Sequence, residues 1–254
     1  MNRLFPVLLS FSSITLAVAC LYFPRIGWAE DVVAVTANLP PYTVENSPKE
    51  PGFSYELLEA VFKRAGVPVT VEFYPWGRAQ MTAKEPKNTH YMIFSLTRSP
   101  AREGEYQWLL NLLPTNTGFI TLAGKEQINS MPEAQAKNLR VGVNRETPWH
   151  EFLLKENYPN IDLVTDEQFN AKKLMAGRID AWYVPIERGF YYLKKLGLQK
   201  KPVAGKSLQT GDLYLAANLN FPTEISAKLR AAFEAVKQKK IHEELYKKYF
   251  GFGQ

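Results

Sequence analysis

The sequence contains little cysteine and little histidine, which limits the chemistry that it can perform. Its 254 residues include one cysteine and three histidines. The cysteine, Cys20, lies in the apolar N-terminal segment. If that segment is removed after Ala29, the remaining chain has no disulfide, no catalytic cysteine and no thiolate metal site. His90 and His242 are far apart in sequence and suggest no catalytic triad, and no metal-ligand spacing is present.

The sequence also has no dense cluster of basic residues, no internal repeat and no low-complexity linker. It contains 31 Lys and Arg against 25 Asp and Glu. The basic residues are scattered, apart from short clusters at 237–240 and 247–248. A nucleic-acid-binding protein needs a basic stripe on a known module, and neither is found. The mild positive charge favours an anionic ligand instead, through long-range attraction.

The first 29 residues are typical of a secretory signal peptide. A basic start is followed by an uncharged apolar segment at residues 4–23, and Gly27-Trp28-Ala29 has the small residues that a signal peptidase requires. The apolar segment is also long enough to be a membrane anchor, although Pro6 favours cleavage. Ala17-Val18-Ala19-Cys20 is a weak match to a lipoprotein cleavage site. We therefore expect export to the periplasm with a cleaved signal peptide, and lipoprotein processing is the less favoured route.

Strands and helices alternate in two successive runs after this segment. One helix is expected to begin at Ser54 and to end before Gly66, and another to lie between Pro185 and Gly197. Two such runs predict an α/β protein with two lobes and a ligand crevice between them. The expected strands are residues 32–35, 67–73, 91–94, 119–123, 139–143, 161–164, 179–184 and 213–217. Residues 223–250 are expected to form two amphipathic helices.

Five short motifs occur in order along almost the whole mature chain. They are Gly52–Leu58 (G-F-x-x-[DE]-L), Ser95–Arg102 (S-x-[ST]-x-T-x-x-R), Arg140–Val143, Ala176–Ala181 (x-G-[RK]-x-D-A) and Tyr246–Gly251 (Y-x-K-[WY]-F-G). Each motif is weak alone, but together they resemble bacterial solute-binding proteins of family three, the polar amino-acid receptors of ABC importers.

This resemblance implies a type II periplasmic-binding-protein fold, with two α/β lobes, a hinge and a ligand crevice between the lobes. Lobe 1 would comprise residues 30–121 and 218–254. Lobe 2, with the hinge strands, would comprise residues 122–217. The protein is then expected to be a monomer that captures a small polar solute with a carboxylate, such as an amino acid, for a membrane permease. It would need no cofactor and would not be an enzyme.

The resemblance also identifies residues that would bind the ligand. The arginine that matches Arg102 binds the ligand carboxylate through two parallel N–H donors. The alternative is a surface arginine paired with Glu103 or Glu105. Ser95 and Thr97 match positions that face the ligand, and their alternative is local loop capping.

An aromatic and cationic segment, Tyr74–Ala79, contains a W-x-R-A element that resembles one branch of the family. Trp76 could form a wall of the site and Arg78 could add a second cationic contact. The alternatives are core packing for Trp76 and a solvated helix position for Arg78. Tyr42 resembles the aromatic residue of the family's P-P-[YF] loop.

Two residues of the expected second lobe complete the predicted site. Thr147 precedes a helix, where its hydroxyl and the free backbone N–H groups could hold an anion. The alternative is a plain helix cap. Trp182 and Tyr183 lie next to each other on a strand and therefore point to opposite faces, and we expect Tyr183 to face the crevice.

The sequence departs from the family where an acidic residue is expected to hold the ammonium of an amino-acid ligand. Pro185 occupies that place, and Glu187 follows slightly later. A buried ammonium without a partner is costly. An α-amino acid therefore requires Glu187 or Glu146 as a substitute, and a carboxylate without an amine becomes comparably plausible.

Two other functions remain open at this stage. A few relatives of these receptors are periplasmic dehydratases, which need a general acid in the crevice; Glu146 is the candidate, with His150 nearby. A receptor that signals to a sensor protein would use the same ligand-driven closure.

Overall fold

The computed structural model describes residues 31–145 and 147–252. The predicted signal peptide and Glu146 lie outside these residues. Within the described part of the chain, no helix is both long and apolar enough to cross a membrane.

Strands and helices alternate along the chain, which confirms the α/β class. The strands are β1 (Val32–Thr36), β2 (Val69–Phe73), β3 (Tyr91–Thr97), β4 (Gln107–Thr121), β5 (Val141–Asn144), β6 (Ile161–Val164), β7 (Ala181–Pro185), β8 (Val203–Ala204) and β9 (Gln209–Ala217). The helices are α1 (Phe53–Ala65), α2 (Trp76–Lys84), α3 (Met131–Ala136), α4 (Pro148–Lys155), α5 (Glu167–Met175), α6 (Ile186–Lys195), α7 (Thr223–Gln238) and α8 (Ile241–Phe250), and a single 3-10 turn, η1, spans Pro100–Arg102.

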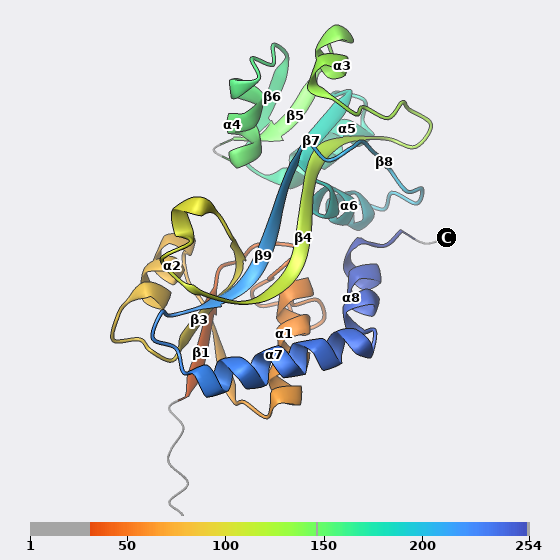
Figure 1. Ribbon diagram of the computed structural model, residues 1–254. Coiled ribbons are helices and arrows are strands. Elements are labelled where there is room, and N and C mark those ends of the chain that lie inside the picture. Colours follow the sequence, from red (N-terminus) through yellow and green to blue (C-terminus); the bar gives the residue numbers. More distant parts are fainter. Residues whose placement is uncertain (1–30, 146, 253–254) are drawn as a thin grey trace, which may run out of the picture. The chain divides into compact units, whose positions relative to one another are not determined.

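The strands form a sheet whose two halves repeat one arrangement. Its order is β2-β1-β3-β9-β4-β7-β5-β6, and β8 pairs with β4. In each half a central strand, β1 or β5, has a parallel neighbour on both sides, and an antiparallel strand, β9 or β4, follows. Figure 1 shows β4 and β9 running side by side from one half to the other.

We call the half around β1 lobe 1 and the half around β5 lobe 2. Lobe 1 contains α1, α2, α7 and α8, and lobe 2 contains α3, α4, α5 and α6 (Figure 1). Both β4 and β9 contribute to the two lobes. The lobe boundaries expected from the sequence, after residues 121 and 217, stay a prediction.

The strand β4 is much longer than the five residues, 119–123, expected from the sequence. It begins at Gln107, and its pairing with β9 shifts register between Trp108 and Leu110 and again between Asn111 and Leu113. Each irregularity breaks the alternation of apolar and polar residues that identifies a strand. Pro114 lies within the same strand, and proline normally argues against one.

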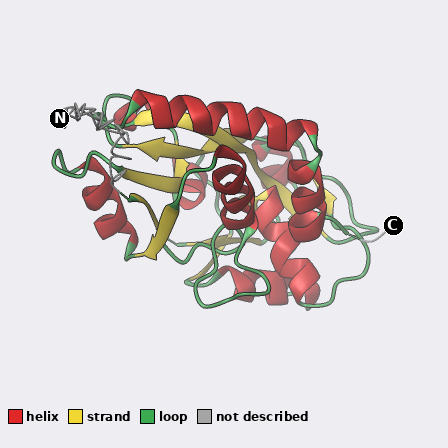
Figure 2. Cartoon of the chain, turned by 90° about the horizontal axis from the view of Figure 1, so that it is seen from below, coloured by secondary structure: helices red, strands yellow, loops and turns green. Residues whose placement is uncertain are grey.

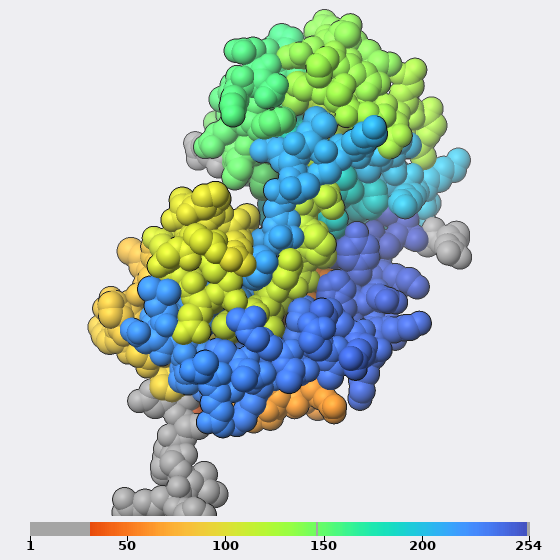
Figure 3. All heavy atoms as spheres, viewed as in Figure 1, coloured from red at the N-terminus to blue at the C-terminus, as the bar shows by residue number. Residues whose placement is uncertain are grey.

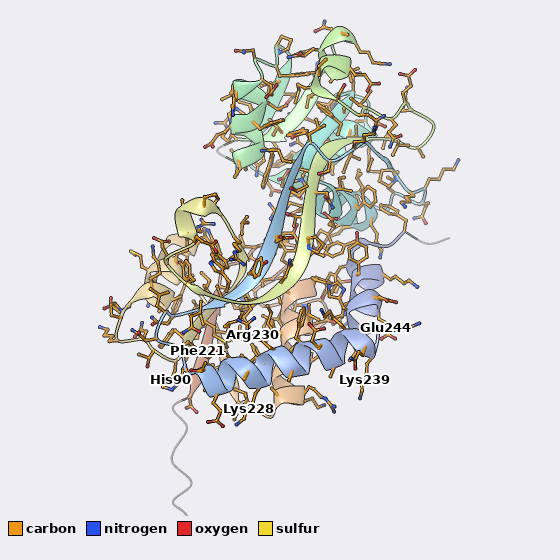
Figure 4. All side chains as sticks on the ribbon, in the orientation of Figure 1. His90, Phe221, Lys228, Arg230, Lys239 and Glu244 are labelled. Carbon is orange, nitrogen blue, oxygen red and sulfur yellow. The ribbon has the colours of Figure 1, made fainter. Side chains whose placement is uncertain are left out.

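Helix α7 secures the first of these irregularities. Arg230 donates from Nη1 to the carbonyl of Leu109 at 2.7 Å and from Nη2 to that of Trp108 at 2.9 Å. Figure 4 shows Arg230 on the side of α7 that faces β4, with Lys228 on the opposite side. The two carbonyl groups at the bulge are therefore satisfied by a charged donor.

Each lobe has its own apolar core. In lobe 1, α1 packs on α7 and α8, and its residues Phe53 and Leu57 are fully buried. In lobe 2, Phe119 and Val143 belong to one buried cluster, and α5 packs against α6. Figure 2 shows helices lying around the strands. Burial of a side chain of this size stabilises the fold by about 1.5–3 kcal/mol.

Two of the five sequence motifs meet at the start of α1. The N–H of Gly52 donates to Tyr249 Oη at 3.0 Å, and the Tyr249 hydroxyl donates to Glu56 Oε1 at 2.6 Å. Gly52 has a φ of 110°, and a Cβ there would lie 2.4 Å from the carbonyl oxygen of Tyr42. Gly52, rather than the expected Ser54, therefore precedes the helix, and Ser54 is buried inside it.

Two other motifs meet at the base of lobe 2. The N–H of Arg140 donates to Asp180 Oδ2 at 2.8 Å, and Arg140 Nη1 donates to the carbonyl of Arg178 at 3.1 Å. These bonds join the start of β5 to the turn before β7. Four of the five motifs thus hold the fold together, and the remaining one, Ser95–Arg102, reaches the candidate site.

Candidate ligand-binding site

The candidate site lies where the parallel strands of both lobes end. In an open α/β sheet, ligands bind in the crevice beyond the carboxyl ends of the strands. In lobe 1 the segments after β1, β2 and β3 contain Tyr42, Trp76 and Arg102. In lobe 2 the segments after β5, β6 and β7 lead into α4, α5 and α6. Figure 3 shows the surface hollowed between the yellow atoms of the segment around η1 and the green atoms of lobe 2.

Arg102 is held in position at the end of β3. It is the last residue of η1, and its side chain is half-buried. Its Nη1 donates to the carbonyl of Thr97 at 3.0 Å, and its Nη2 donates to Gln80 Oε1 at 3.1 Å. Both acceptors are neutral. A guanidinium has five N–H donors, so the remaining ones are able to bind an acid group.

The carboxylates near Arg102 pair with other cations. Glu103 pairs with Arg98, and Glu105 Oε1 lies 2.9 Å from Lys84 Nζ. The pairing of Arg102 with Glu103 or Glu105, which was the alternative from the sequence, is therefore not present. The charge of Arg102 is not cancelled by either neighbour.

Ser95 and Thr97 lie on β3 in different environments. Ser95 is buried with a φ of 59°, at a register shift between Phe94 and Leu96. Its Oγ is also buried and has no hydrogen-bond partner within the described residues. Thr97 is exposed at the end of the strand, and its carbonyl accepts a bond from Arg102. Thr97 therefore contacts Arg102 through its carbonyl group, and Ser95 lies two residues earlier on the same strand.

Trp76 and Arg78 lie in the first turn of α2. Trp76 is half-buried and packs partly against a lobe 1 cluster that includes Ile93. Arg78 is exposed, and its Cζ lies 4.3 Å from the ring centroid of Tyr74. This contact places the guanidinium over an aromatic face at the end of β2.

Both tyrosines that were expected at the site are buried, but in different surroundings. Tyr42 is 3 % exposed and belongs to the lobe 1 core, where its ring lies 6.4 Å from that of Phe250. Its burial raises the pKa of its hydroxyl to about 12. Tyr183 is fully buried, stacks on Phe152 at 5.7 Å and donates to Gln209 Oε1 at 3.2 Å. It does not face the crevice.

Tyr183 was misassigned because both faces of its strand are covered. Alternation along a strand places Trp182 and Tyr183 on opposite faces, but it does not say that one face is open. Trp182 packs in a second lobe 2 cluster and is also fully buried. A strand buried on both faces is usual for a parallel sheet.

Thr147 is the cap of α4. Its Oγ1 accepts from the N–H of His150 at 3.2 Å and donates to the carbonyl of Asn144 at 2.6 Å. The single hydroxyl proton is thus directed to a carbonyl and is not available to an anion. The plain-cap interpretation describes the Thr147 side chain correctly.

A charged group that the sequence did not identify lies in lobe 2. Arg188 is in the first turn of α6, and its Cζ lies 5.3 Å from the ring centroid of Tyr42 and 5.6 Å from that of Trp149. Its Nη1 is 3.8 Å from Glu167 Oε1. In the sequence, two charged residues, Glu187 and Arg188, follow the apolar strand that ends at Pro185. Only the fold shows that Arg188 contacts residues of both lobes.

Burial dominates the electrostatics of Glu167. This residue is 5 % exposed, and desolvation raises the pKa of its carboxyl from 4.5 to about 7. Arg188 and the indole N–H of Trp182 oppose this shift. The contacts of the carboxyl with Trp182 and Asn170 are too weak in geometry to count as hydrogen bonds within the described residues. At neutral pH, more of this carboxyl is therefore protonated than of an exposed glutamate.

Glu187, next to Arg188 at the start of α6, interacts with groups of other elements. Its carboxyl is buried, and its pKa is raised by desolvation, which the backbone N–H of Asn116 and the Tyr246 hydroxyl oppose. Those two groups belong to β4 and α8. Glu187 therefore interacts with the hinge strand and lobe 1. Pro185 is the last residue of β7 and directly precedes α6, whereas the strand was expected to end at residue 184. The other possible substitute, Glu146, lies outside the described residues.

Within residues 31–145 and 147–252, no group of three or more His, Cys, Asp or Glu residues could hold a metal ion. The polar groups after the strands include two arginines that are at least half-buried, Arg102 and Arg188, and the exposed Arg78. Hydroxyls, an amide and the shifted carboxyls of Glu167 and Glu187 complete the set. Such a set binds a polar ligand by charge and hydrogen bonds.

The fold and these strand-end groups define the class of two-lobed solute-binding proteins. The chain belongs to the bacterial extracellular solute-binding proteins, family 3, whose model matches residues 32–252. This membership confirms the resemblance inferred from the motifs. No curated protein sequence matches the chain.

Many solved structures share the fold at low sequence identity. An ancestral cationic amino acid solute-binding protein has a TM-score of 0.72 at 18% identity, covering 87% of this chain and 95% of that one. Substrate-binding domain 2 of GlnP from Lactococcus lactis, in an open conformation, has a TM-score of 0.68 at 16% identity, with 88% and 96% covered. A histidine kinase sensor domain has a TM-score of 0.64 at 18% identity, with 87% and 96% covered. The same fold therefore occurs both in a substrate-binding domain and in a sensor domain of a histidine kinase.

Proposed function

We propose that this protein is a periplasmic receptor that captures a small solute with a carboxylate and delivers it to the permease of an ABC-type importer. The observation that supports this most is Arg102. Its guanidinium is oriented by two neutral acceptors, Thr97 and Gln80, directly after the end of β3. Membership of family 3 supports the receptor role.

In this proposal the solute carboxylate binds to the N–H groups of Arg102 that the fold leaves available. Ser95 Oγ and the N–H groups near Thr97 add hydrogen bonds, and Trp76 forms a side wall. Lobe 2 then closes over the solute, because the ligand shifts an open–closed equilibrium toward the closed state. The receptor is expected to act as a monomer.

The experiment is a thermal-shift screen of the purified protein against amino acids, organic acids, amines and small peptides. A ligand that binds the folded state raises the melting temperature by mass action. Arg102→Ala should weaken binding of a carboxylate hit by about 100-fold, because it removes charge-assisted hydrogen bonds. Arg64→Ala, on the exposed side of α1, is the matched control. Unchanged affinity in Arg102→Ala would sink the proposal.

Uptake by cells distinguishes an importer from a sensor. Deletion of the gene should abolish high-affinity uptake of the identified solute if the partner is a permease. Normal uptake after deletion, with a lost transcriptional response to the solute, would favour a sensor partner instead.

A further inference from the structure

Arg188 is the second arginine at the strand ends, and the two lobes together surround it. Its side chain is 17 % exposed. Tyr42 follows β1 in lobe 1, whereas Trp149 follows β5 and Glu167 follows β6 in lobe 2. Its contacts with all three place the guanidinium where strands of both lobes end. This is the part of the sheet that forms a ligand crevice.

The charge of Arg188 is only partly compensated. Its one ion pair within the described residues is with Glu167, at 3.8 Å, which is longer than a hydrogen bond. Desolvation raises the pKa of Glu167 to about 7, which weakens its negative charge at neutral pH. The other two contacts are with aromatic rings, and the guanidinium also interacts with the Tyr42 hydroxyl, whose pKa it lowers against the effect of burial.

Several buried polar atoms around Arg188 have no partner within the described residues. They are Nε of Arg188 itself, Nε1 of Trp149 and both carboxyl oxygens of Glu167. A buried polar atom without a partner costs free energy, and native proteins satisfy most such groups. Arg188 Nε and Trp149 Nε1 are N–H donors, and one of them belongs to the cation. An acid group of a ligand would satisfy both donors and the charge together.

An amine would be disfavoured at the same place. A ligand ammonium near Arg188 would meet a like charge in a partly dehydrated site, which costs free energy. Glu187, the nearest carboxyl on α6, is engaged by Asn116 and Tyr246 instead. The guanidinium of Arg188 therefore favours an acid group of the solute over an amine at this place.

We propose that Arg188 is a specificity-determining residue that binds a second acid group, so that the solute is a small dicarboxylate-type anion without an amine. One acid group binds Arg102 in lobe 1, and the other binds Arg188 in lobe 2. The solute thereby bridges the lobes. This inference rests on the proposed receptor function and adds the chemical class of the solute.

The test is calorimetric titration with sets of solutes matched in length. The first set is succinate, its mono-amide succinamate and L-aspartate, and the second is glutarate, its mono-amide glutaramate and L-glutamate. The wild type should bind at least one dicarboxylate about tenfold or more tightly than its mono-amide and its amino acid, because one charge-assisted contact is lost or opposed.

Arg188→Gln should remove this preference. The affinity for the dicarboxylate should fall by about tenfold or more, toward the affinity for the mono-amide. The affinity for the mono-amide should change by less than about threefold. Arg188→Lys should keep part of the preference, because it retains the charge without the paired donors. Arg64→Gln controls for net charge. If Arg188→Gln does not fold, the wild-type ratios and Arg188→Lys decide.

The two levels of the proposal fail differently. An amino acid or a mono-amide that binds the wild type more tightly than the matched dicarboxylate would overturn the role of Arg188, while the receptor function would stand. Equal weakening of both solutes by Arg188→Gln would do the same. If no carboxylate binds, or if binding is insensitive to Arg102→Ala, the receptor proposal fails and this inference fails with it.

Discussion

Arg102 in lobe 1 and Arg188 in lobe 2 both follow a strand of the sheet, yet their surroundings differ. Arg102 is half-buried, and two neutral oxygen atoms, from Thr97 and Gln80, fix its guanidinium. Arg188 is 17 % exposed, lies against two aromatic rings and faces the carboxyl of Glu167 at 3.8 Å. A cation fixed by neutral acceptors presents a constant charge to a ligand. Arg188 also keeps its charge, but Glu167 titrates beside it, so the net charge of the pair varies with pH.

The largest effect expected from this difference is a pH-dependent stability in lobe 2. The carboxyl of Glu167 has a pKa of about 7 in the folded protein against 4.5 ordinarily, so the folded state binds its proton more tightly. This contribution is fully favourable below about pH 4.5 and is lost as the pH rises to about 7. The wild type therefore loses free energy of unfolding, on the order of 3 kcal/mol, as the pH rises through this range, and Glu167→Gln should not show this loss.

The measurement is urea unfolding of the wild type and Glu167→Gln at several pH values between 5 and 8. The free energy of unfolding of the variant, relative to the wild type, should increase with pH. Glu59→Gln, on the exposed face of α1, controls for the loss of one charge. Parallel curves for the wild type and Glu167→Gln would contradict the assignment of a raised pKa to Glu167.

The second effect compares the paired motifs of the two lobes, at the start of α1 and at the start of β5. In lobe 1, Tyr249→Phe removes one bond to Gly52 and one to Glu56 and leaves the Gly52 N–H without its partner. We expect a loss of about 1–3 kcal/mol in the free energy of unfolding. In lobe 2, Asp180→Ala removes a bond that is exposed to water, and the expected loss is at most about 1 kcal/mol.

Chemical denaturation of both variants checks this ranking. Lys248→Ala is the control for lobe 1, because its ion pair with Glu56 is on the surface and is worth less than about 1 kcal/mol. A larger loss for Asp180→Ala than for Tyr249→Phe would show that water does not replace the lobe 2 bond.

These contacts explain how much of the fold the sequence could predict. The motifs at Gly52, Arg140, Asp180 and Tyr249 are recognisable because each is fixed by a specific bond within the fold. The long strand β4 was not recognisable, because two register shifts and Pro114 obscure its alternation. Ser54 was expected to cap α1, but the chain reaches that helix through Gly52 with a φ of 110°.

The site was predictable in lobe 1 and not in lobe 2. Arg102 lies within a local motif with Thr97, so its partners are nearby in sequence. The neighbours of Arg188 come from three other segments that only the fold brings together: Tyr42, Trp149 and Glu167. Alternation assigned Tyr183 to the crevice, because a sequence cannot show that a second layer covers that face of β7.

A smaller effect distinguishes the threonines at the two strand ends. Thr147→Ala in lobe 2 should cost about 1 kcal/mol of stability through the lost helix cap, and it should leave solute affinity unchanged. Thr97→Ala in lobe 1 should leave stability within about 0.5 kcal/mol, because the side chain is exposed. Thermal unfolding and calorimetric titration of both variants measure the two quantities. A weaker affinity in Thr147→Ala, with Thr147→Ser unaffected, would restore a ligand contact for that hydroxyl.

The smallest effect on stability, and the sharpest on the lobe 1 cation, is expected at Gln80. Its Oε1 accepts from Arg102 Nη2 at 3.1 Å, so it orients the guanidinium without altering its charge. Gln80→Ala should lower solute affinity by about three- to tenfold, as one neutral hydrogen bond to a charged group is lost, and stability should change by less than about 0.5 kcal/mol.

Gln80→Glu is the more informative variant, because it adds a carboxylate beside Arg102 and gives lobe 1 the arrangement now found in lobe 2. The new carboxylate would compete with the solute for the same guanidinium, so affinity should fall further than in Gln80→Ala. Gln135→Glu, which changes a lobe 2 glutamine bonded to the carbonyl of Glu156, controls for the added charge. If Gln80→Glu binds the solute as tightly as Gln80→Ala, Arg102 does not provide the anion-binding charge of lobe 1. The comparison between an arginine held by neutral acceptors and an arginine beside a titrating carboxyl would then not explain solute binding.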